Sequence, residues 1–402
     1  MNAPANRAGG FAGTAYDEAI GRARSLVPTL RERAAKAEQA RIMSPETQAD
    51  LHRAGVLRCM QPKRWGGMEF DYFAYVDFPM ELARGCASTG WNAANLIIHH
   101  WMLALYDERA QAEVWGANPD ALIASGIAFP QGRAKKVDGG YLIGGRWNFS
   151  STVNVADWNM LAVTVRDGDK PVDYRMCLLH KSQYEIVDDW QVLGMKSTGS
   201  MTVAVKELFV PEYKALGMLD ARGGDGFPGA RANPNPVYRV PLSCLGGHGI
   251  GAVTVGNAMA AHELTCDLVK ERSTSYTAMK MRDFQAVQLR VGTAGAKIDA
   301  ARLILRNDCL EGQRIAEENR IADVRTKLRF KRNLAYAVTL ATEAVDSLHV
   351  MAGANGIYDS YPIQRIFRDA HAGAGHISFS LDAHASAWGL AALGGEVNNP
   401  TL

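Results

Sequence analysis

The order in which hydrophobic periodicities follow one another restricts the fold of this chain more than any other feature. Apolar side chains recur at helical spacing over residues 16–116. Residues 121–211 instead contain short runs of alternating apolar and polar residues, broken by glycine and aspartate, which are typical of strands. Long helical segments return from Leu242 onward. Helices, then strands, then helices predict an α+β fold with a compact β unit between two helical parts.

This pattern divides the chain into three expected domains. We expect an N-terminal helical domain over residues 16–120, a central β domain over residues 121–230 and a C-terminal helical domain over residues 231–402. The central domain is expected to be a small antiparallel sheet or barrel, and the C-terminal domain a four-helix bundle. The long helices of the C-terminal domain are expected at residues 250–271, 281–318 and 321–351.

Local signals set some of the element boundaries. Ser44 followed by Pro45 predicts the start of a helix, with the serine as N-cap, and Gly55 predicts its end. Residues 222–236 are rich in glycine and proline and predict a connector, either a mobile lid or a loop that faces a partner.

Composition excludes several classes of protein. Of the 402 residues, 47% are hydrophobic and 21% charged, which is typical of a globular chain. A net charge of +2 gives no reason to expect nucleic acid or an anionic membrane as partner, and no run of about 18 apolar residues predicts a membrane span. The six cysteines are scattered and the N-terminus lacks the apolar segment of a signal peptide, so we expect reduced thiols in the cytoplasm. We expect no metal site.

One segment near the C-terminus carries a family resemblance. It reads Tyr361-Pro-Ile-Gln-Arg-Ile-Phe-Arg-Asp-Ala-His-Ala-Gly-Ala-Gly-His376, and its first half, together with residues 351–357 before it, resembles the end of an acyl-CoA dehydrogenase. Many members of that family continue from the Arg-Asp pair into Tyr-Glu-Gly-Thr, whose glutamate removes the α-proton of a thioester. Here no carboxylate follows until Asp382, and a histidine, His376, stands close to the position of the glutamate. The resemblance therefore implies a flavoprotein scaffold without the base for dehydrogenation.

Further segments resemble the same superfamily in the same order, from about residue 16 to the C-terminus. Within it, three segments resemble the flavin-dependent aromatic monooxygenases that take reduced flavin from a separate reductase. The segments matching the superfamily are 51–56, 62–67, 188–200 and 284–288, and those matching the monooxygenases are 86–102, 145–151 and 368–376. The resemblance implies an acyl-CoA dehydrogenase-like fold and an oxygenase component.

The resemblance also implies a reaction and its partners. Reduced FAD or FMN, supplied by an NAD(P)H-dependent flavin reductase, would react with O2 to give a C4a-hydroperoxide that transfers oxygen to an aromatic carbon. Relatives hydroxylate hydroxyphenylacetate, chlorophenols, a steroid-derived phenol, and indole or indole-3-acetate, and residues 88–103 look closest to the indole branch. Relatives are usually tetramers formed through their C-terminal bundles, so we expect a homotetramer.

Three residues are the expected catalytic groups. Ser151 falls where dehydrogenases place the threonine that bonds flavin N5, so its hydroxyl is expected to hold N5–H and slow the loss of hydrogen peroxide. His376 follows a segment of small residues and has an ordinary pKa near roughly 6.5, which suits proton relay. His99 lies in an apolar helical stretch, and a histidine at this place in the resembled enzymes faces the aromatic substrate. A buried or surface-exposed histidine is otherwise usually structural.

Other residues are expected to contact the flavin or the substrate. Phe129 and Gln131 match a loop whose backbone amides bond the pyrimidine edge of the flavin, and Arg272 resembles an arginine that binds the FAD pyrophosphate across a subunit interface. The expected flavin-contacting set is Phe129, Gln131, Phe149, Ser150, Ser151, Lys196, Thr198, Ser200 and Arg272. The expected substrate-contacting set is His99, Trp91 and Trp101.

Two alternative functions remain open from the residues alone. One is an acyl-CoA dehydrogenase that uses another carboxylate, such as Asp369 or Asp382, as its base. The other is a non-catalytic member that keeps the fold for binding or assembly.

Overall fold

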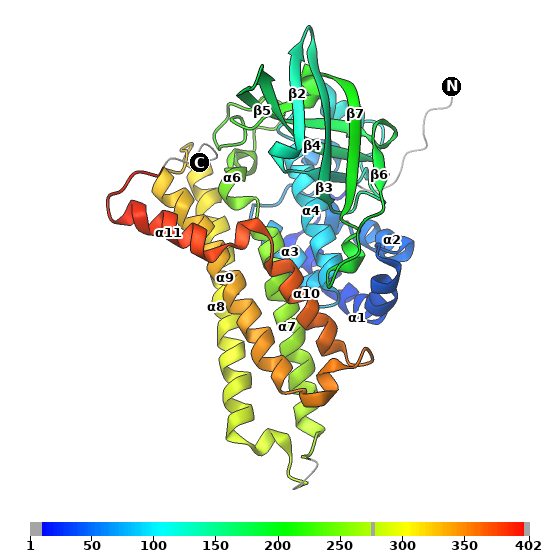
Figure 1. Ribbon diagram of the computed structural model, residues 1–402, viewed down its shortest axis with the longest axis vertical. Helices are drawn as coiled ribbons and strands as arrows, with labels where there is room; N and C mark the ends of the chain where they lie inside the picture. The colour runs from blue at the N-terminus through cyan, green and yellow to red at the C-terminus, as the bar shows by residue number, and fades with distance from the viewer. Residues whose placement is uncertain (1–9, 275–277, 398–402) are drawn as a thin grey trace.

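The computed structural model describes residues 10–274 and 278–397. Its N-terminal part is helical, as the periodicity predicted (Figure 1). Ser44 caps the second helix by accepting a hydrogen bond from the Thr47 amide at 3.2 Å, and Gly55, at a φ of 72°, ends that helix. Both local predictions are confirmed. The helices are α1 (Tyr16–Ala40), α2 (Pro45–Ala54), α3 (Ala74–Ala83), α4 (Ala87–Leu103) and α5 (Glu108–Trp115).

The central part is a sheet whose strands follow the order β6-β7-β3-β2-β4-β5-β8, with β1 paired to β4. Most strand pairs are antiparallel, as expected, but β1 and β2 both run parallel to β4. Alternating side chains arise in both kinds of pairing, so the sequence pattern could not separate them. The strands are β1 (Ile123–Gly126), β2 (Gly132–Val137), β3 (Gly140–Ser150), β4 (Trp158–Asp167), β5 (Lys170–His180), β6 (Glu185–Val187), β7 (Met201–Pro211) and β8 (Ala215–Gly217).

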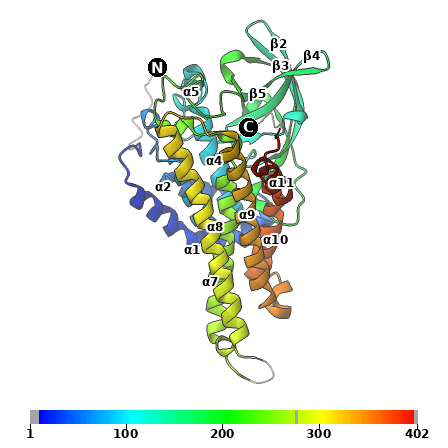
Figure 2. The ribbon, with the colours of Figure 1, turned by 90° about the vertical axis from the view of Figure 1, so that its left-hand side faces the viewer.

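The C-terminal part contains the expected long helices. Figure 2 shows α8 and α9 side by side, and α7 also packs against both of them. Gly256 lets α7 approach α3 closely, since a Cβ at this position would lie 2.1 Å from the Met80 carbonyl oxygen. The helices are α6 (Leu242–Leu245), α7 (His248–Glu271), α8 (Gln285–Glu317), α9 (Val324–Val350), α10 (Pro362–Ala374) and α11 (Leu381–Ala392).

The expected domain limits stay predictions, although the change of element type is clear. The chain passes from helices to strands between Trp115 and Ile123, and back to helices between Gly217 and Leu242. The acyl-CoA dehydrogenase-like arrangement expected from the resemblance, with a helical part, a sheet and a helical bundle, is confirmed.

The glycine- and proline-rich connector is docked on the N-terminal helices. The Gly229 amide donates to the Leu105 carbonyl at 3.0 Å, and the Asn233 side chain donates to the Ala104 carbonyl at 2.9 Å. Phe227 is buried. These contacts correct the interpretation of residues 222–236 as a lid, because a side-chain amide and a backbone amide hold the segment on the protein.

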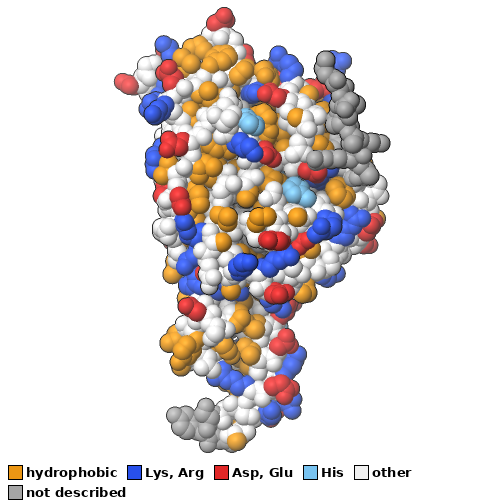
Figure 3. All heavy atoms as spheres, turned by 90° about the vertical axis from the view of Figure 1, so that its right-hand side faces the viewer, with side chains coloured by type: hydrophobic (Ala, Val, Ile, Leu, Met, Phe, Trp, Pro, Cys, Tyr) orange, Lys and Arg blue, Asp and Glu red, His pale blue; other side chains and the backbone are white. Residues whose placement is uncertain are grey.

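Charges of both signs are interspersed on the face that carries α1, α2 and β6 (Figure 3). Hydrophobic side chains lie between them, and no single sign dominates this face. Among the helices that the structure describes, none combines the length and the apolar character that crossing a bilayer requires.

Two hydrogen bonds connect α10 to the loop that precedes β7. The Asp369 carboxylate accepts a hydrogen bond from the Met195 amide at 2.6 Å, and Arg368 donates to the Leu193 carbonyl at 2.8 Å. Gly194, between these two anchored residues, is required because a Cβ there would lie 2.4 Å from the Arg368 carbonyl oxygen. Burial raises the pKa of Asp369 to about 6, against the opposing effect of the Met195 hydrogen bond.

This raised pKa predicts a pH dependence of stability. A carboxyl whose pKa is higher in the folded than in the unfolded chain binds more protons when folded, so stability falls as pH rises from about 4 to about 6. Asp369→Asn keeps an oxygen that can accept from Met195 but does not titrate. Relative to wild type, the variant should gain about 1–3 kcal/mol in free energy of unfolding between pH 4 and pH 7. Urea denaturation at several pH values measures this difference.

The matched control is Asp382→Asn, which removes an exposed carboxylate from the first turn of α11. It reports the effect of removing a carboxylate that no backbone amide of the 193–200 segment binds. A pH dependence of Asp369→Asn identical to that of wild type would show that the carboxyl titrates outside this window.

Candidate active site

Three side chains of helix α4 lie on one side of the helix. Two of them, Trp91 and His99, were expected to contact the substrate, and the third, Asn95, was not. All its residues are buried except Trp91 and Asn95, which are partly exposed. Trp91, Asn95 and His99 are four residues apart and therefore follow one another along the same side of the helix. This side of α4 is where the helix reaches the surface of an otherwise closed core.

The end of β3 presents successive side chains in different directions. The pairing of β3 with β7 is irregular between Trp147 and Ser150, and Phe149 adopts a φ of 63°, in the left-handed region. Ser150 turns inward, where its hydroxyl accepts a hydrogen bond from the Asn159 side chain at 3.0 Å. Phe149 remains 70% exposed. The structure thus separates Ser150 from the group formed around Ser151.

Ser151 lies in a line of hydrogen-bonded hydroxyl groups. The Trp91 indole Nε1–H donates to Ser151 Oγ at 3.2 Å. Ser151 Oγ lies 2.8 Å from Ser200 Oγ, which lies 2.7 Å from Thr198 Oγ1. Thr198 Oγ1 in turn donates to the Met195 carbonyl at 2.8 Å. The structure therefore brings together four of the expected residues, Trp91, Ser151, Thr198 and Ser200.

His376 joins this group through the Trp91 ring. The two ring centroids are 5.9 Å apart in an edge-on arrangement, and Phe379 lies 5.3 Å from the imidazole. Nδ1 of His376 accepts a hydrogen bond from the Ser378 amide at 3.2 Å, so the neutral ring carries its hydrogen on Nε2. Burial lowers the pKa of His376 to about 4. At neutral pH this side chain is a neutral imidazole with one N–H to donate.

His99 has the opposite tautomer. Its Nδ1 lies 2.6 Å from the Ile123 carbonyl oxygen, which only accepts, so Nδ1 carries the hydrogen and Nε2 is a free acceptor. Burial lowers the pKa of His99 to about 4. His99 lies eight residues after Trp91, or about 12 Å further along the helix axis. It is therefore not in the cluster around Ser151 but on the same side of α4.

Three other residues expected to contact the flavin, Gln131, Phe129 and Lys196, have partners outside the Ser151 group. Gln131 accepts a hydrogen bond from the Asn148 amide at 3.0 Å, which places its loop beside the end of β3. Phe129 packs edge-on against Tyr174 at 5.4 Å. Lys196 points to Glu38 on α1, with 3.9 Å between Nζ and the carboxylate.

Trp101 is a core residue, and its expected role in a substrate pocket stays a prediction. It is fully buried, and its indole donates to the Val237 carbonyl at 2.8 Å. Its ring packs edge-on against Tyr72 at 5.7 Å. Burial distinguishes the two tryptophans, because Trp101 lies wholly in the core while Trp91 is partly exposed.

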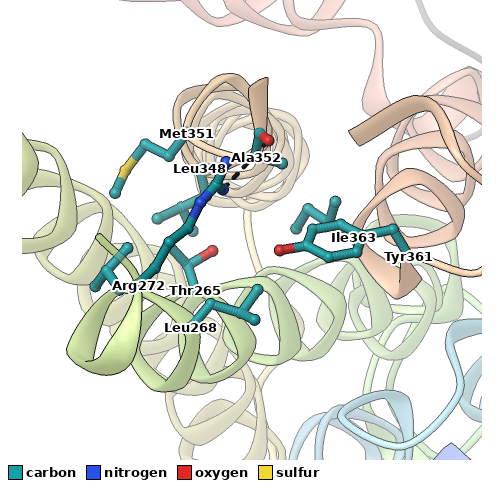
Figure 4. Close-up of a pocket in the computed structure, with 9 residues that line it drawn as sticks. Thr265, Leu268, Arg272, Leu348, Met351, Ala352, Tyr361 and Ile363 are labelled. Carbon is teal, nitrogen blue, oxygen red and sulfur yellow. Dashed lines mark hydrogen bonds between the residues drawn. The ribbon is translucent and has the colours of Figure 1, made fainter. Parts of the chain in front are cut away.

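Arg272 lies at the far end of α7 from the Ser151 group. It donates to the Ala352 carbonyl at 3.4 Å and lines a shallow pocket into which Tyr361 points (Figure 4). Helix α7 passes the Trp91 group near Thr254, and the 18 residues from there to Arg272 span about 27 Å. Arg272 and Ser151 of the same chain are therefore too far apart to share one site. The expected role of Arg272 across a subunit interface stays a prediction.

Asn95 is a candidate that the motifs did not reveal. Its side-chain amide donates to the Trp91 carbonyl at 2.8 Å, which leaves its oxygen available on the side shared with His99. The spacing Trp91-x-x-x-Asn95-x-x-x-His99 is the signal that identifies this side in the sequence.

The chemistry of these residues fits a reduced flavin. An exposed phenylalanine at positive φ combines backbone strain with apolar exposure, and a flat apolar ring would relieve the exposure. Phe149 meets Trp190 edge-on at 6.0 Å, so the two rings offer an aromatic surface beside the Ser151 hydroxyl. Leu193 and Ile377, in the flanking segments, are 65% and 82% exposed. Apolar surface beside a few fixed polar groups is typical of a cofactor site.

Asp369 and Asp382 do not supply a base to this group. The Asp369 carboxylate is used by the Met195 amide and lies in a cleft with Arg84, Asn257 and Arg365. Asp382 is exposed on α11.

Two family models match this chain, one at each end. They are the acyl-CoA dehydrogenase N-terminal domain, over residues 22–117, and the acyl-CoA dehydrogenase C-terminal domain, over residues 248–381.

Curated relatives match most of the chain. The flavin-dependent monooxygenase oxygenase subunit HsaA of Mycobacterium tuberculosis is 34% identical, over 88% of this chain and 89% of the relative. The oxygenase component of an FADH2-dependent resorcinol hydroxylase from Rhizobium sp. is 34% identical, over 93% of this chain and 94% of the relative. An indole-3-acetate monooxygenase of Pseudomonas putida is 29% identical, over 86% and 87%.

The fold matches solved structures equally well. The crystal structure of 3-HSA hydroxylase from Rhodococcus sp. RHA1 aligns with a TM-score of 0.91 and 31% identity, over 96% of this chain and 99% of that chain. With relatives above 30% identity along most of its length, the chain belongs to the acyl-CoA dehydrogenase family and, within it, to the oxygenase components of flavin-dependent monooxygenases.

Proposed function

We propose that this oxygenase component hydroxylates a small electron-rich aromatic compound, a phenol in the first place and indole or indole-3-acetate in the second. Reduced FAD or FMN would come from a separate NAD(P)H-dependent reductase. The observation that carries the proposal is the group around Trp91, where a serine hydroxyl and a neutral imidazole meet the same indole ring. This group contains hydrogen-bonding residues but no carboxylate that could act as the base of a dehydrogenation.

Each polar residue of this group would hold the flavin or order the site around it. Bound reduced flavin supplies the electrons for O2 activation and the oxygen transfer itself. Ser151 would accept a hydrogen bond from N5, while Phe149 and Trp190 provide apolar surface and the loop of Phe129 and Gln131 provides backbone amides. Buried Thr198 and Ser200 hold Ser151, so they are less suited to the ribityl or phosphate contacts expected from the sequence.

His376 would act as a hydrogen-bond donor inside a dry site. Its Nε2–H is fixed by the hydrogen bond that Nδ1 accepts from Ser378. Because its pKa is about 4, it is uncharged at neutral pH and can donate without repelling other charges. A neutral donor of this kind can stabilise negative charge on an oxygen atom through a hydrogen bond, but it does not give up its proton, because a neutral imidazole is a far weaker acid than an imidazolium. A hydrogen-bonding role therefore replaces the proton relay expected from the sequence.

His99 would orient the aromatic substrate instead of deprotonating it. A phenol has a pKa of roughly 10, and the imidazolium form of His99 has a pKa of about 4, so complete proton transfer is unfavourable by about six pKa units. A hydrogen bond from the phenol hydroxyl, or from an indole N–H, to Nε2 is favourable. His99 therefore suits both substrate classes as a positioning acceptor, with Trp91 and Asn95 on the same side of α4.

The choice of a phenol before an indole rests on the relatives. The resorcinol hydroxylase is more similar to this chain than the indole-3-acetate monooxygenase is, although residues 88–103 resemble the indole branch. Assays with both classes decide between them.

We also propose a homotetramer located in the cytoplasm. Exposed apolar side chains along α8 support an interface between bundles, because isolated chains rarely leave such side chains uncovered along one helix. They are Leu289, Leu303 and Leu310. In such an assembly Arg272 would bind the pyrophosphate of FAD held by a partner subunit.

The proposed reaction predicts coupled oxygen use. With chemically reduced flavin, O2 and a phenol such as resorcinol or hydroxyphenylacetate, the chain should form a hydroxylated product and less hydrogen peroxide than the same flavin without protein. Product analysis by chromatography and a peroxide assay measure the ratio. If neither phenols, indole nor indole-3-acetate yields product, and peroxide forms at the rate of free flavin, the proposal is wrong.

His99→Asn tests the positioning role of His99. The asparagine amide can still donate to the Ile123 carbonyl, so the local fold is kept, but the acceptor at Nε2 is lost. We expect the dissociation constant of the phenol to rise about tenfold, while flavin affinity stays unchanged. Calorimetric titration measures both. Equal losses of phenol and flavin affinity would indicate a structural defect and contradict the assignment.

His376→Asn separates the chemical role of His376 from its structural one. Asparagine can accept the Ser378 hydrogen bond in place of Nδ1, and it is a good cap, but it lacks the Nε2–H. The hydroxylation rate should fall roughly 100-fold, as for the loss of one hydrogen-bond donor to a developing negative charge, with the melting temperature retained. His376→Ala, which loses both roles, is the comparison. An asparagine variant with wild-type hydroxylation would leave His376 with capping alone.

A further inference from the structure

The hydrogen bonds around Ser151 have only one possible direction. A carbonyl oxygen accepts and never donates, and each serine or threonine hydroxyl has one hydrogen to give. Thr198 gives its hydrogen to the Met195 carbonyl, at 2.8 Å. Across the 2.7 Å contact between Thr198 and Ser200, Ser200 must therefore be the donor.

The same reasoning determines the state of Ser151. Because Ser200 donates its hydrogen to Thr198, Ser151 must be the donor in the 2.8 Å contact with Ser200. The Trp91 indole, which only donates, occupies one of the two lone pairs of Ser151 Oγ. A single lone pair of Ser151 Oγ remains to accept a hydrogen bond from a further partner. Ser151 is thus fixed as an acceptor.

Burial makes this direction difficult to reverse. Ser151, Ser200 and Thr198 are 8%, 4% and 2% exposed, so water cannot take over a lost hydrogen bond. Turning the Ser151 hydroxyl outward would leave two oxygen atoms of the line facing each other without a hydrogen between them. An unsatisfied buried group of this kind changes an equilibrium by roughly 10- to 100-fold.

We propose that Thr198 and Ser200 are positioning residues that fix the direction of the Ser151 hydroxyl and make the site select reduced over oxidised flavin. The inference rests on the proposed function, in which Ser151 faces flavin N5. Reduced flavin carries a hydrogen on N5 and can donate to the free lone pair of Ser151. Oxidised flavin has only a lone pair on N5, which would face the lone pair of Ser151 and be repelled.

This selectivity has a consequence for a component that receives its flavin by diffusion. Oxidised flavin released after a reaction cycle competes for the site with newly reduced flavin. A fixed acceptor at N5 discriminates between the two forms by the one hydrogen that distinguishes them there. The discrimination uses no charge, so it should be insensitive to salt.

The test compares dissociation constants of reduced and oxidised flavin for the full chain, under anaerobic conditions, with FAD and with FMN. In Thr198→Val, Ser200 is free to donate to Ser151, and Ser151 is free to donate to oxidised N5. The Met195 carbonyl still accepts from the Thr198 backbone amide at 3.1 Å. We expect the ratio of the oxidised to the reduced dissociation constant to fall at least tenfold, mainly through tighter binding of oxidised flavin.

Three further variants serve as a second test and as controls. Ser200→Ala removes the acceptor of the Ser151 hydroxyl and should lower the ratio in the same direction. Thr198→Ser retains the hydroxyl and should restore the wild-type ratio. Thr202→Val, two residues along β7 from Ser200, removes a buried hydroxyl that donates to Asn148 at 3.1 Å, outside this line, and should leave the ratio unchanged.

The reduction potential of the bound flavin gives a second readout. Tighter binding of the reduced form raises the potential, so a tenfold loss of selectivity should lower it by about 30 mV in a two-electron couple. Spectroelectrochemical titration of wild type and Thr198→Val measures this shift.

The outcomes separate the inference from the function on which it rests. If Ser151→Ala alters the ratio but Thr198→Val and Ser200→Ala do not, the line of hydroxyls does not set the selectivity and the inference is overturned. If Ser151→Ala changes neither dissociation constant, Ser151 does not face N5, and the proposed flavin site fails together with the inference.

Discussion

The hydrogen bond from the Met195 amide to the buried Asp369 carboxylate joins the segment that leads into β7 to the C-terminal helices. It anchors the segment from Leu193 to Ser200 on α10, and this segment carries the hydroxyls that reach Ser151 at the end of β3. Ser151 in turn contacts Trp91 on α4, whose ring meets His376 beyond the end of α10. The connections form a closed circuit through the N-terminal helices, the sheet and the C-terminal helices. A displacement of any one part would therefore be felt at the group around Ser151.

Burial shifts the pKa of three titrating groups in or near this circuit. Burial lowers the pKa of His99 and of His376 to about 4, and raises that of Asp369 to about 6. Both histidines are consequently neutral at physiological pH, and their roles follow from which nitrogen carries the hydrogen. His99 offers an acceptor and His376 a donor, because each ring uses its Nδ1 on a backbone group of opposite character. Two residues of one type thus supply two different functions.

Much of the fold could be predicted from the sequence, because the signals for it are local. The cap at Ser44, the end at Gly55 and the long bundle helices follow from neighbouring residues. The parallel pairing of β1 and β2 with β4 could not be predicted, since strand direction depends on partners far away in the sequence. The resemblance indicated Ser151 and His376, but Trp91 and Trp101 looked equivalent until the structure showed that Trp91 is partly exposed on α4 and Trp101 is buried in the core. Roles for Thr198 and Ser200 depended on contacts with Ser151, almost fifty residues away, which no local pattern records.

The exchange of a carboxylate for an imidazole near position 376 is a change in hydrogen-bonding character as much as in acidity. An ionised carboxylate only accepts, which suits the removal of a proton from carbon. A neutral imidazole whose Nδ1 is occupied can only donate through Nε2, which suits contact with an oxygen atom that gains electron density. Ser151 shows the complementary constraint, since its hydrogen is committed to Ser200 and it can only accept. The family scaffold can therefore support oxygen transfer without a new fold, because the polarity of a few buried hydrogen bonds decides which flavin chemistry the site favours.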